Sequence, residues 1–179
     1  EHIVRNLAQG IRNVTILDAG AGPLTILGKV WPGHEVEIVP IDELADEYAA
    51  ILHWHSVVPL IPTIKCSMEH IGERFPESSF DIVYCRNALD HCTDPIASVL
   101  GMFNVVKPGC VVLLDHETNE GENEHYTGLH QWNIVTMDNR VSIWGKDAAN
   151  ELDDLLPVGT DINVSVYKGW NLITIRKPK

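Results

Sequence analysis

The stretch LDAGAGP, residues 17–23, places a carboxylate and two glycines at the end of an apolar run. Because Gly20 and Gly22 have no side chains, a ligand can approach the backbone there and φ can become positive. The spacing departs from the G-x-G-x-x-G pattern of dinucleotide sites, since Thr25 occupies the position of the third glycine. Asp18 would repel a pyrophosphate. These residues therefore favour a ligand that carries an ammonium or sulfonium cation.

A second group of chemically capable side chains lies in the polar segment after residue 115. It comprises His116, Glu117, Glu120, Glu122, Glu124, His125, His130 and Trp132. A neutral histidine can take the proton of an acceptor group as a general base. We therefore name His116 and His130 as candidate catalytic residues and His91 as a third, and Trp132 could form a wall against a sugar-like substrate. A solvated loop with incidental histidines is the alternative interpretation.

Metal binding is a further way to interpret these histidines and carboxylates, because clusters of such residues can hold cations. Tight ligand spacing such as H-E-x-x-H does not occur in the chain. From the sequence alone we therefore expect no metal site.

An open parallel sheet is the framework that would bring these groups together. Apolar runs predict strands over 15–18, 36–41, 63–66, 80–85 and 111–115, and helical patterns cover 1–13, 23–30, 43–53 and 95–106, the last capped by Asp94. Helical crossovers between apolar strands are typical of a parallel sheet covered on both faces. Ligands bind beyond the carboxyl ends of such strands. In the rest of the chain, after residue 115, the sequence pattern predicts a loop over 117–130, a hairpin over 134–144, a helix over 147–156 and a hairpin over 161–175.

The segment ILDAGAGPLT resembles motif I of the class I S-adenosylmethionine-dependent methyltransferases, with Leu24 where a third glycine is common. Four later segments resemble further motifs of this family in the same order: VEIVPIDEL, IKCSMEHIGERFPESSFDIVYC, YCRNALDHCTDP and MFNVVKPGCVVLLDHE. The resemblance covers roughly residues 3–117 and is closest to methyltransferase type 11. It implies an α/β fold: a Rossmann-like three-layer sandwich with a mostly parallel seven-stranded sheet and an antiparallel C-terminal edge hairpin.

The resemblance also implies S-adenosyl-L-methionine as the cofactor and a set of residues that bind it. These are Asp18, Ala19, Gly20, Gly22, Asp42, Glu43, Ser67, Met68, Glu69, Asn87, Ala88 and Leu89. Asp42 would accept hydrogen bonds from the ribose hydroxyls, and it also suits the start of the helix over 43–53. Met68 would lie over the adenine or pack in the core. Ser67 replaces the family's usual aspartate, and His91, where many members carry a histidine, could instead make a structural hydrogen bond.

Composition limits the classes of protein and partner. The 179 residues suit one domain, and because the chain begins with Glu1 rather than Met we expect residues to precede it in a longer protein. The net charge of −12, without a basic stripe, disfavours nucleic acid as a partner. No apolar run approaches the roughly 18 residues of a membrane helix, so we expect no membrane partner. Four cysteines without a C-x-x-C pair indicate a reducing, cytoplasmic location.

The favoured function is therefore a single methyltransferase domain over residues 1–179. It would move a methyl group from S-adenosylmethionine to an oxygen or nitrogen of a small molecule, such as a sugar or another metabolite. Residues 116–146 would form an acceptor-side loop and hairpin insertion. The alternative is a catalytically inactive, methyltransferase-like module that only binds the cofactor. Asp18 disfavours a nicotinamide-dependent oxidoreductase, and the sequence indicates neither the acceptor nor the oligomeric state.

Overall fold

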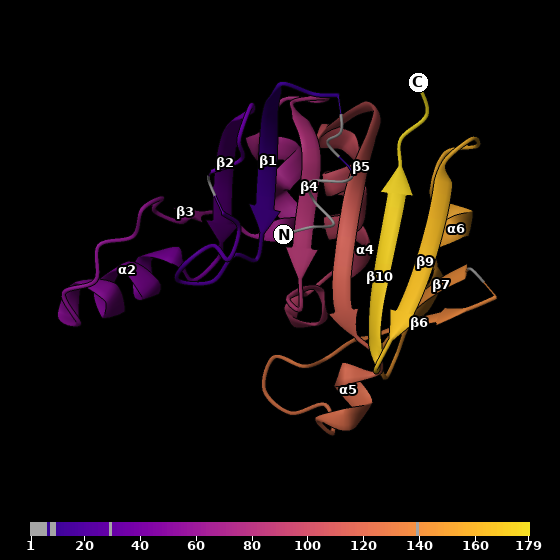
Figure 1. Ribbon diagram of the computed structural model, residues 1–179. Helices are drawn as coiled ribbons and strands as arrows, with labels where there is room; N and C mark the ends of the chain where they lie inside the picture. The colour runs from indigo at the N-terminus through magenta and orange to yellow at the C-terminus, as the bar shows by residue number, and fades with distance from the viewer. Residues whose placement is uncertain (1–6, 8–9, 29, 139) are drawn as a thin grey trace.

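The computed structural model describes residues 7, 10–28, 30–138 and 140–179, so the expected helix over 1–13 lies largely outside the described residues. Seven strands form one sheet in the order β3-β2-β1-β4-β5-β10-β9 (Figure 1). They are β1 Asn13–Ala19, β2 Glu35–Asp42, β3 Ile64–Lys65, β4 Phe80–Arg86, β5 Val106–Glu117, β9 Asp161–Tyr167 and β10 Trp170–Arg176. The first five are parallel, and β10 pairs antiparallel with both β5 and β9. The predicted Rossmann-like α/β fold and its edge hairpin are confirmed.

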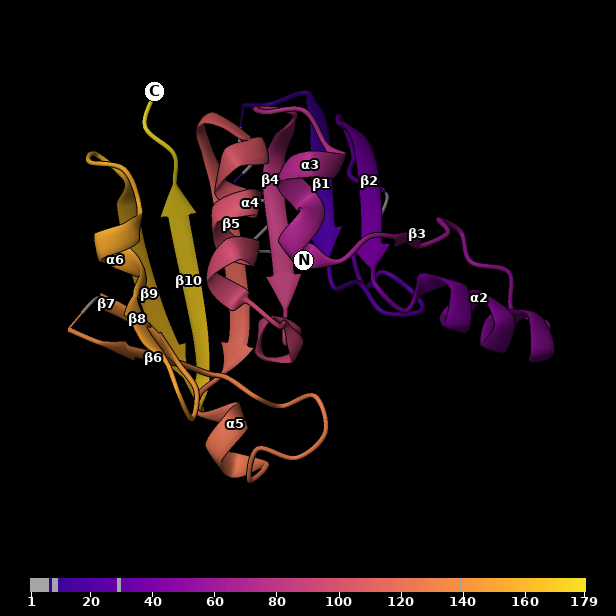
Figure 2. The ribbon, with the colours of Figure 1, turned by 180° about the vertical axis from the view of Figure 1, so that it is seen from behind.

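One face of the sheet is covered by helices, as Figure 2 shows for α3, α4 and α6. The helical segments are α2 Ala45–Trp54, η1 Met68–His70, α3 Ile71–Arg74, η2 Leu89–His91, α4 Pro95–Val105, α5 Glu120–Asn123 and α6 Leu152–Leu155. The Asp94 side chain accepts a hydrogen bond from the Ala97 amide over 2.9 Å, which confirms the predicted cap of α4. Val99 and Met102 on α4 are fully buried against the sheet.

The opposite face carries a second apolar cluster that includes Val14, Ile16 and Ile82. In the described part of the chain, it is covered by irregular segments that include Leu27 and Trp31. The helix predicted over 23–30 is wrong, because residues 23–28 form a turn and irregular structure. The segment from Pro23 to Gly28 has only six residues, far fewer than the roughly 12 that a helix needs to be stable alone.

Thr25, within this segment, makes side-chain hydrogen bonds instead of taking part in a helix. The Thr25 hydroxyl donates to the Asp18 carboxylate over 2.5 Å and accepts from the Leu27 amide over 3.2 Å. Such local side-chain bonds compete with helical hydrogen bonding. Helix α2 also departs from the sheet, projecting sideways in Figure 1 with Ala45 as its buried residue.

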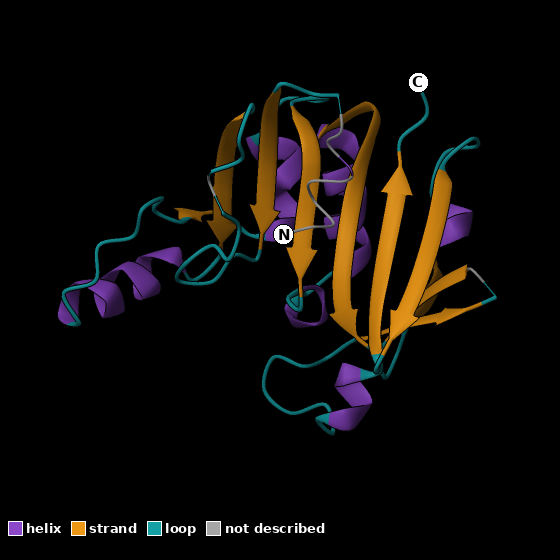
Figure 3. Cartoon of the chain, in the orientation of Figure 1, coloured by secondary structure: helices purple, strands orange, loops and turns teal. Residues whose placement is uncertain are grey.

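A small second sheet follows β5, as the colouring of Figure 3 makes clear. It contains β6 Asn133–Met137, β7 Arg140–Trp144 and β8 Ala149–Glu151, so the hairpin predicted over 134–144 is confirmed. The helix predicted over 147–156 is wrong in its first half, because β8 pairs with β7 and only the single turn α6 remains. The Val141 amide donates to Asp153 over 2.9 Å, which ties α6 to β7. None of the helices in the described ranges is long and apolar enough to cross a lipid bilayer.

Candidate active site

The carboxyl ends of β1, β2 and β4 meet at one edge of the sheet, where the amides of Gly20 and Ala21 both donate to the Ile41 carbonyl over 2.9 Å. A cavity of about 230 Å³ opens at this edge. It is lined by Gly20, Asp42, Glu43, Leu44, Tyr48, Met68, Glu69, Ala88, His91, Cys92 and Leu129. The structure thus brings together many of the predicted cofactor residues with one of the predicted catalytic histidines.

Asp42 organises the rim of this cavity. Its Oδ2 accepts a hydrogen bond from the Gly22 amide over 3.0 Å, and its Oδ1 accepts one from the Leu44 amide over 2.9 Å. Helix α2 begins at Ala45, so Leu44 rather than Asp42 is its N-cap residue. The carboxylate therefore fixes the glycine loop against the end of β2 while it faces the cavity.

Gly20 separates this cavity from a second, more open one of about 440 Å³. The second cavity is lined by Asp18, Gly20, Ala21, Ile26, Tyr84, Arg86 and Asn87. Gly20 has φ of +72°, and a Cβ built on it would lie only 2.4 Å from the Ala88 Cβ. The direction that a side chain would take from Gly20 is thus occupied by Ala88, while its backbone borders both cavities. Close packing of the two loops is therefore a second reason for a glycine at this position.

Asp18 lies at the end of β1 with only 3% of its surface exposed. Burial raises its pKa to about 6, and the hydrogen bond from Thr25 opposes that rise. The carboxyl group borders the second cavity rather than the first. A cationic group in that cavity would lower the cost of keeping it ionised.

Several predicted cofactor residues have structural contacts instead of a place in either cavity lining. Ala19 and Leu89 are fully buried in the main core.

The Ser67 hydroxyl donates to Glu69 over 2.8 Å, and Glu69 also accepts from the Thr93 amide over 2.8 Å. Burial raises the pKa of Glu69, but the hydrogen bonds that it accepts outweigh burial and lower it. Glu69 therefore ties the segment after β3 to the start of α4 while it borders the first cavity.

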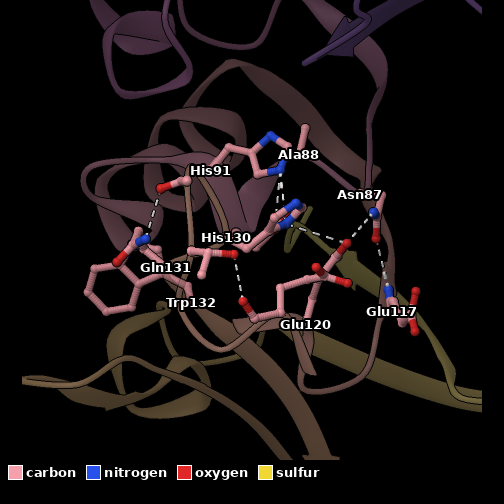
Figure 4. Close-up of polar contacts among 12 residues, drawn as sticks. Asn87, Ala88, His91, Glu117, Glu120, His130, Gln131 and Trp132 are labelled. Atoms are coloured by element: carbon pink, nitrogen blue, oxygen red, sulfur yellow. Dashed lines mark hydrogen bonds and ion pairs between the residues drawn. The ribbon is translucent and has the colours of Figure 1, made fainter. Parts of the chain in front are cut away.

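His91, which lines the first cavity, lies next to His130 (Figure 4), and both imidazoles contact Asp90, so that the three residues form a cluster. The Nδ1 atom of His130 lies 2.7 Å from Asp90 Oδ2 and 3.2 Å from His91 Nε2. His91 Nε2 lies 3.3 Å from the same Asp90 oxygen. Burial lowers the pKa of His130, but its bond to Asp90 and the surrounding carboxylates raise it more. His91 and His130 are thus the predicted catalytic residues that the structure brings together.

Glu120 and Asn87 extend this cluster, as the dashed contacts in Figure 4 show. The side-chain amide of Asn87 donates from Nδ2 to Glu120 Oε1 over 2.9 Å, and Glu120 Oε1 lies 3.6 Å from His130 Nδ1. The side-chain oxygen Oδ1 of Asn87 accepts from the backbone amide of Glu117 over 3.1 Å. Burial raises the pKa of Glu120, and the Asn87 bond opposes that rise. A contiguous polar network therefore joins the loop after β4 to the segment after β5.

His116, the remaining predicted catalytic residue, lies apart from both cavity linings. It is fully buried on β5, and neither ring nitrogen has a hydrogen-bond partner among the described residues. Burial, together with the charge of His91, lowers its pKa to about 3, so the ring stays neutral near pH 7. Trp132 is also absent from both linings, and its indole donates to the Cys92 carbonyl over 2.8 Å.

The sequence did not point to four residues that line the first cavity, namely Leu44, Tyr48, Cys92 and Leu129. Tyr48 follows Leu44 by about one helical turn, a spacing that would place both on one side of α2. Asp90 was missed as well, although an acid directly before His91 is a recognisable signal for a group that orients an imidazole.

Comparison with known proteins identifies the family. Residues 17–114 match the family model described as methyltransferase domain. An uncharacterized methyltransferase of Schizosaccharomyces pombe is 33% identical in an alignment of 102 residues that covers 52% of this chain and 36% of that protein. The ubiquinone biosynthesis O-methyltransferase of Pseudomonas paraeruginosa is 22% identical over 93% of this chain and 77% of that protein.

Solved structures share the fold. The phosphoethanolamine N-methyltransferase 2 of Haemonchus contortus, solved with S-adenosyl-L-methionine, has a TM-score of 0.66 and 14% identity over 99% of this chain and 52% of that one. The chain thus spans about a third of the S. pombe relative and about half of this structure. With the family model matching more than half of its length, this chain belongs to the S-adenosylmethionine-dependent methyltransferase domain family.

Proposed function

We propose that this chain binds S-adenosylmethionine at the edge of the sheet and transfers its methyl group to an oxygen or nitrogen of a small molecule. One observation carries the proposal: a single cavity connects the Asp42 carboxylate at the end of β2 with His91 beyond β4. This connection supports a site in which the cofactor and the group that handles the acceptor proton are adjacent.

The residues of this cavity fit a positively charged nucleoside. Each carboxylate oxygen of Asp42 accepts one backbone amide, and a carboxylate oxygen has a second lone pair that can accept a ribose hydroxyl. Met68 and Ala88 give an apolar surface that suits an adenine ring. The carboxylates of Glu43 and Glu69 add negative charge that favours a cation. When bound, the cofactor supplies a methyl group activated by a positively charged sulfur.

The acceptor end of the site would be built from the histidine cluster and the segment 116–146. Asp90 accepts a hydrogen bond from His130 and so fixes the orientation of that ring. Leu129 and His91 both line the cavity, so an acceptor held there contacts an apolar side chain and an imidazole. Holding the acceptor atom close to the sulfonium methyl is the main contribution a protein can make to such a displacement.

Charge and cysteine chemistry support a metabolite as the acceptor and the cytoplasm as the location. The net charge of −12 is unfavourable for a phosphate backbone. Cys66, Cys85 and Cys92 are buried free thiols and Cys110 is partly buried, which suits a reducing compartment.

Two measurements on the purified chain test the proposal. Isothermal titration calorimetry with S-adenosylmethionine and with NAD compares the two cofactor classes, and we expect binding of the former alone. Incubation with methyl-labelled S-adenosylmethionine and a panel of phenols, catechols, sugars and amines then tests transfer. Binding without transfer to any acceptor favours a cofactor-binding module that lacks catalysis. Absence of S-adenosylmethionine binding overturns the proposal.

A further inference from the structure

The cluster of Asp90, His91 and His130 has the composition and spacing of a metal site. Asp90 Oδ2, His91 Nε2 and His130 Nδ1 all lie within 4.8 Å of one another. We propose that these three atoms bind a divalent transition-metal ion of the Zn²⁺ class beside the cofactor cavity. Sequence spacing hides such a site, because His130 lies 40 residues beyond Asp90.

The separations of the three atoms suit a tetrahedral ion. Zn²⁺ binds imidazole nitrogen and carboxylate oxygen at about 2.0–2.2 Å, so two ligand atoms in a tetrahedral site are about 3.3–3.6 Å apart. The distances from His91 Nε2 to His130 Nδ1 and to Asp90 Oδ2 are 3.2 Å and 3.3 Å. The 2.7 Å between His130 Nδ1 and Asp90 Oδ2 is a hydrogen-bond distance. Replacing that proton with a metal requires this one pair to move apart by less than an ångström.

The charges around the cluster call for a cation. Asp90 is fully buried and Glu120 is 7% exposed. In the described ranges, Asp90 Oδ1 and Glu120 Oε2 lack any hydrogen-bond partner. The ion-pair partners found for these two carboxylates are the neighbouring histidines, which carry charge only when protonated. Buried carboxylates are costly unless they are paired, and a divalent ion supplies the charge that neutral imidazoles lack.

The ligand set also selects the kind of ion. Two imidazoles and one carboxylate suit Zn²⁺ and its transition-metal neighbours, whereas Mg²⁺ and Ca²⁺ prefer oxygen ligands. Three protein ligands leave one tetrahedral position open, which is typical of catalytic rather than structural zinc. Because His91 lines the cavity, an ion held by this cluster would lie beside the proposed acceptor. This last step rests on the proposed function, whereas metal binding itself does not.

Calorimetric titration of the tag-free, chelator-treated chain with ZnCl₂ tests the inference. We expect one Zn²⁺ per chain, a loss of at least tenfold in affinity in His130→Ala and in Asp90→Asn, and no change in His53→Ala. His53 is a matched control because it is an exposed histidine on α2, outside the cluster. MgCl₂ should give at least tenfold weaker binding. Circular dichroism establishes that each variant is folded.

The outcomes separate this inference from the proposed function. Equal Zn²⁺ affinity in wild type, His130→Ala and Asp90→Asn, or no Zn²⁺ binding by folded wild type, overturns the metal site. Equally strong Mg²⁺ binding overturns the assignment to the Zn²⁺ class. Titration with S-adenosylmethionine in the presence of a chelator tests the cofactor site alone. If the chain binds S-adenosylmethionine but not Zn²⁺, only the metal site is overturned. If it binds Zn²⁺ but not S-adenosylmethionine, only the proposed function is overturned.

Discussion

The Asp42 carboxylate accepts a hydrogen bond from the Gly22 amide over 3.0 Å, twenty residues earlier in the chain. This bond joins the glycine loop after β1 to the end of β2. The Thr63 hydroxyl donates to the Gly22 carbonyl over 2.9 Å, so the backbone N–H and the backbone C=O of Gly22 are both hydrogen-bonded. Asp42 thus holds one side of the cavity in shape as well as facing its interior.

We expect Asp42→Ala to weaken S-adenosylmethionine binding by about 1–3 kcal/mol, because hydrogen bonds to the ribose are lost. Asp42→Asn keeps one carbonyl oxygen and should lose less. Calorimetry measures both, with Asp46→Ala as the control. Asp46 is an exposed acid four residues away that pairs with Lys65 and does not line the cavity. Wild-type affinity in Asp42→Ala would remove Asp42 from the cofactor site.

The two glycines of this loop should respond differently to alanine. A Cβ at Gly20 meets the Ala88 Cβ at 2.4 Å, whereas a Cβ at Gly22 meets nothing within 4 Å. Both have positive φ, which costs an L-residue about 1–2 kcal/mol at either position. We therefore expect Gly20→Ala to lower the free energy of unfolding clearly more than Gly22→Ala does. Urea denaturation compares them, and equal losses would mean that the Ala88 contact is easily relieved.

The sheet was predictable from the sequence because its strands are marked by apolar runs that lie between clear breaks. Residues 80–85 form such a run, and β4 follows it closely. The loop over 23–28 was not predictable, since Pro23 also begins many helices and only the tertiary bond from Thr25 to Asp18 shows the competing structure. Strand β8 was missed for a related reason, because its pairing with β7 outweighs local helical preference.

The cofactor side of the candidate site followed from motifs that are local in sequence, such as the one that contains Asp42. The acceptor side required contacts between distant segments. His130 and Asp90 meet because η2 and the segment after α5 converge beyond the carboxyl ends of β4 and β5, and their sequence spacing carries no sign of this. His116 shows the converse: its residue type suggested catalysis, while its position on β5 buries it.

Replacement of His116 by phenylalanine should preserve methyl transfer and maintain or raise stability. The ring is fully buried, and among the described residues neither nitrogen has a hydrogen-bond partner. An apolar ring of similar shape removes the cost of those unpaired polar atoms. The native pKa of about 3 lies below the usual 6.5, so this histidine contributes stability above pH 6.5 that is lost as pH falls toward 3.

His116→Phe should therefore lose less stability than wild type when the pH falls from 7 to 4. Thermal unfolding at several pH values measures this, and labelled methyl transfer measures activity. If His116→Phe is folded but transfers no methyl group, His116 is needed for catalysis and the prediction is wrong.

Asp18→Asn should stabilise the ligand-free protein near neutral pH and weaken the binding of a cationic ligand. Burial raises the pKa of Asp18 from its usual 3.8 to about 6. A raised carboxyl pKa means that the native state favours the protonated form, so stability is full below pH 3.8 and is lost as pH rises through about 6. The difference corresponds to about 3 kcal/mol above both values. Asparagine avoids that loss and can still accept the Thr25 hydrogen bond.

The melting temperature of Asp18→Asn should accordingly exceed that of wild type at pH 7.5 and match it near pH 4. Asp46→Asn, at an exposed carboxylate, should follow the wild-type pH dependence. We also expect Asp18→Asn to bind S-adenosylmethionine more weakly than wild type, because the side chain that borders the second cavity no longer carries a charge. Parallel pH profiles for Asp18→Asn and wild type would show that Asp18 ionises in the native state without cost, and its burial would then not control its charge.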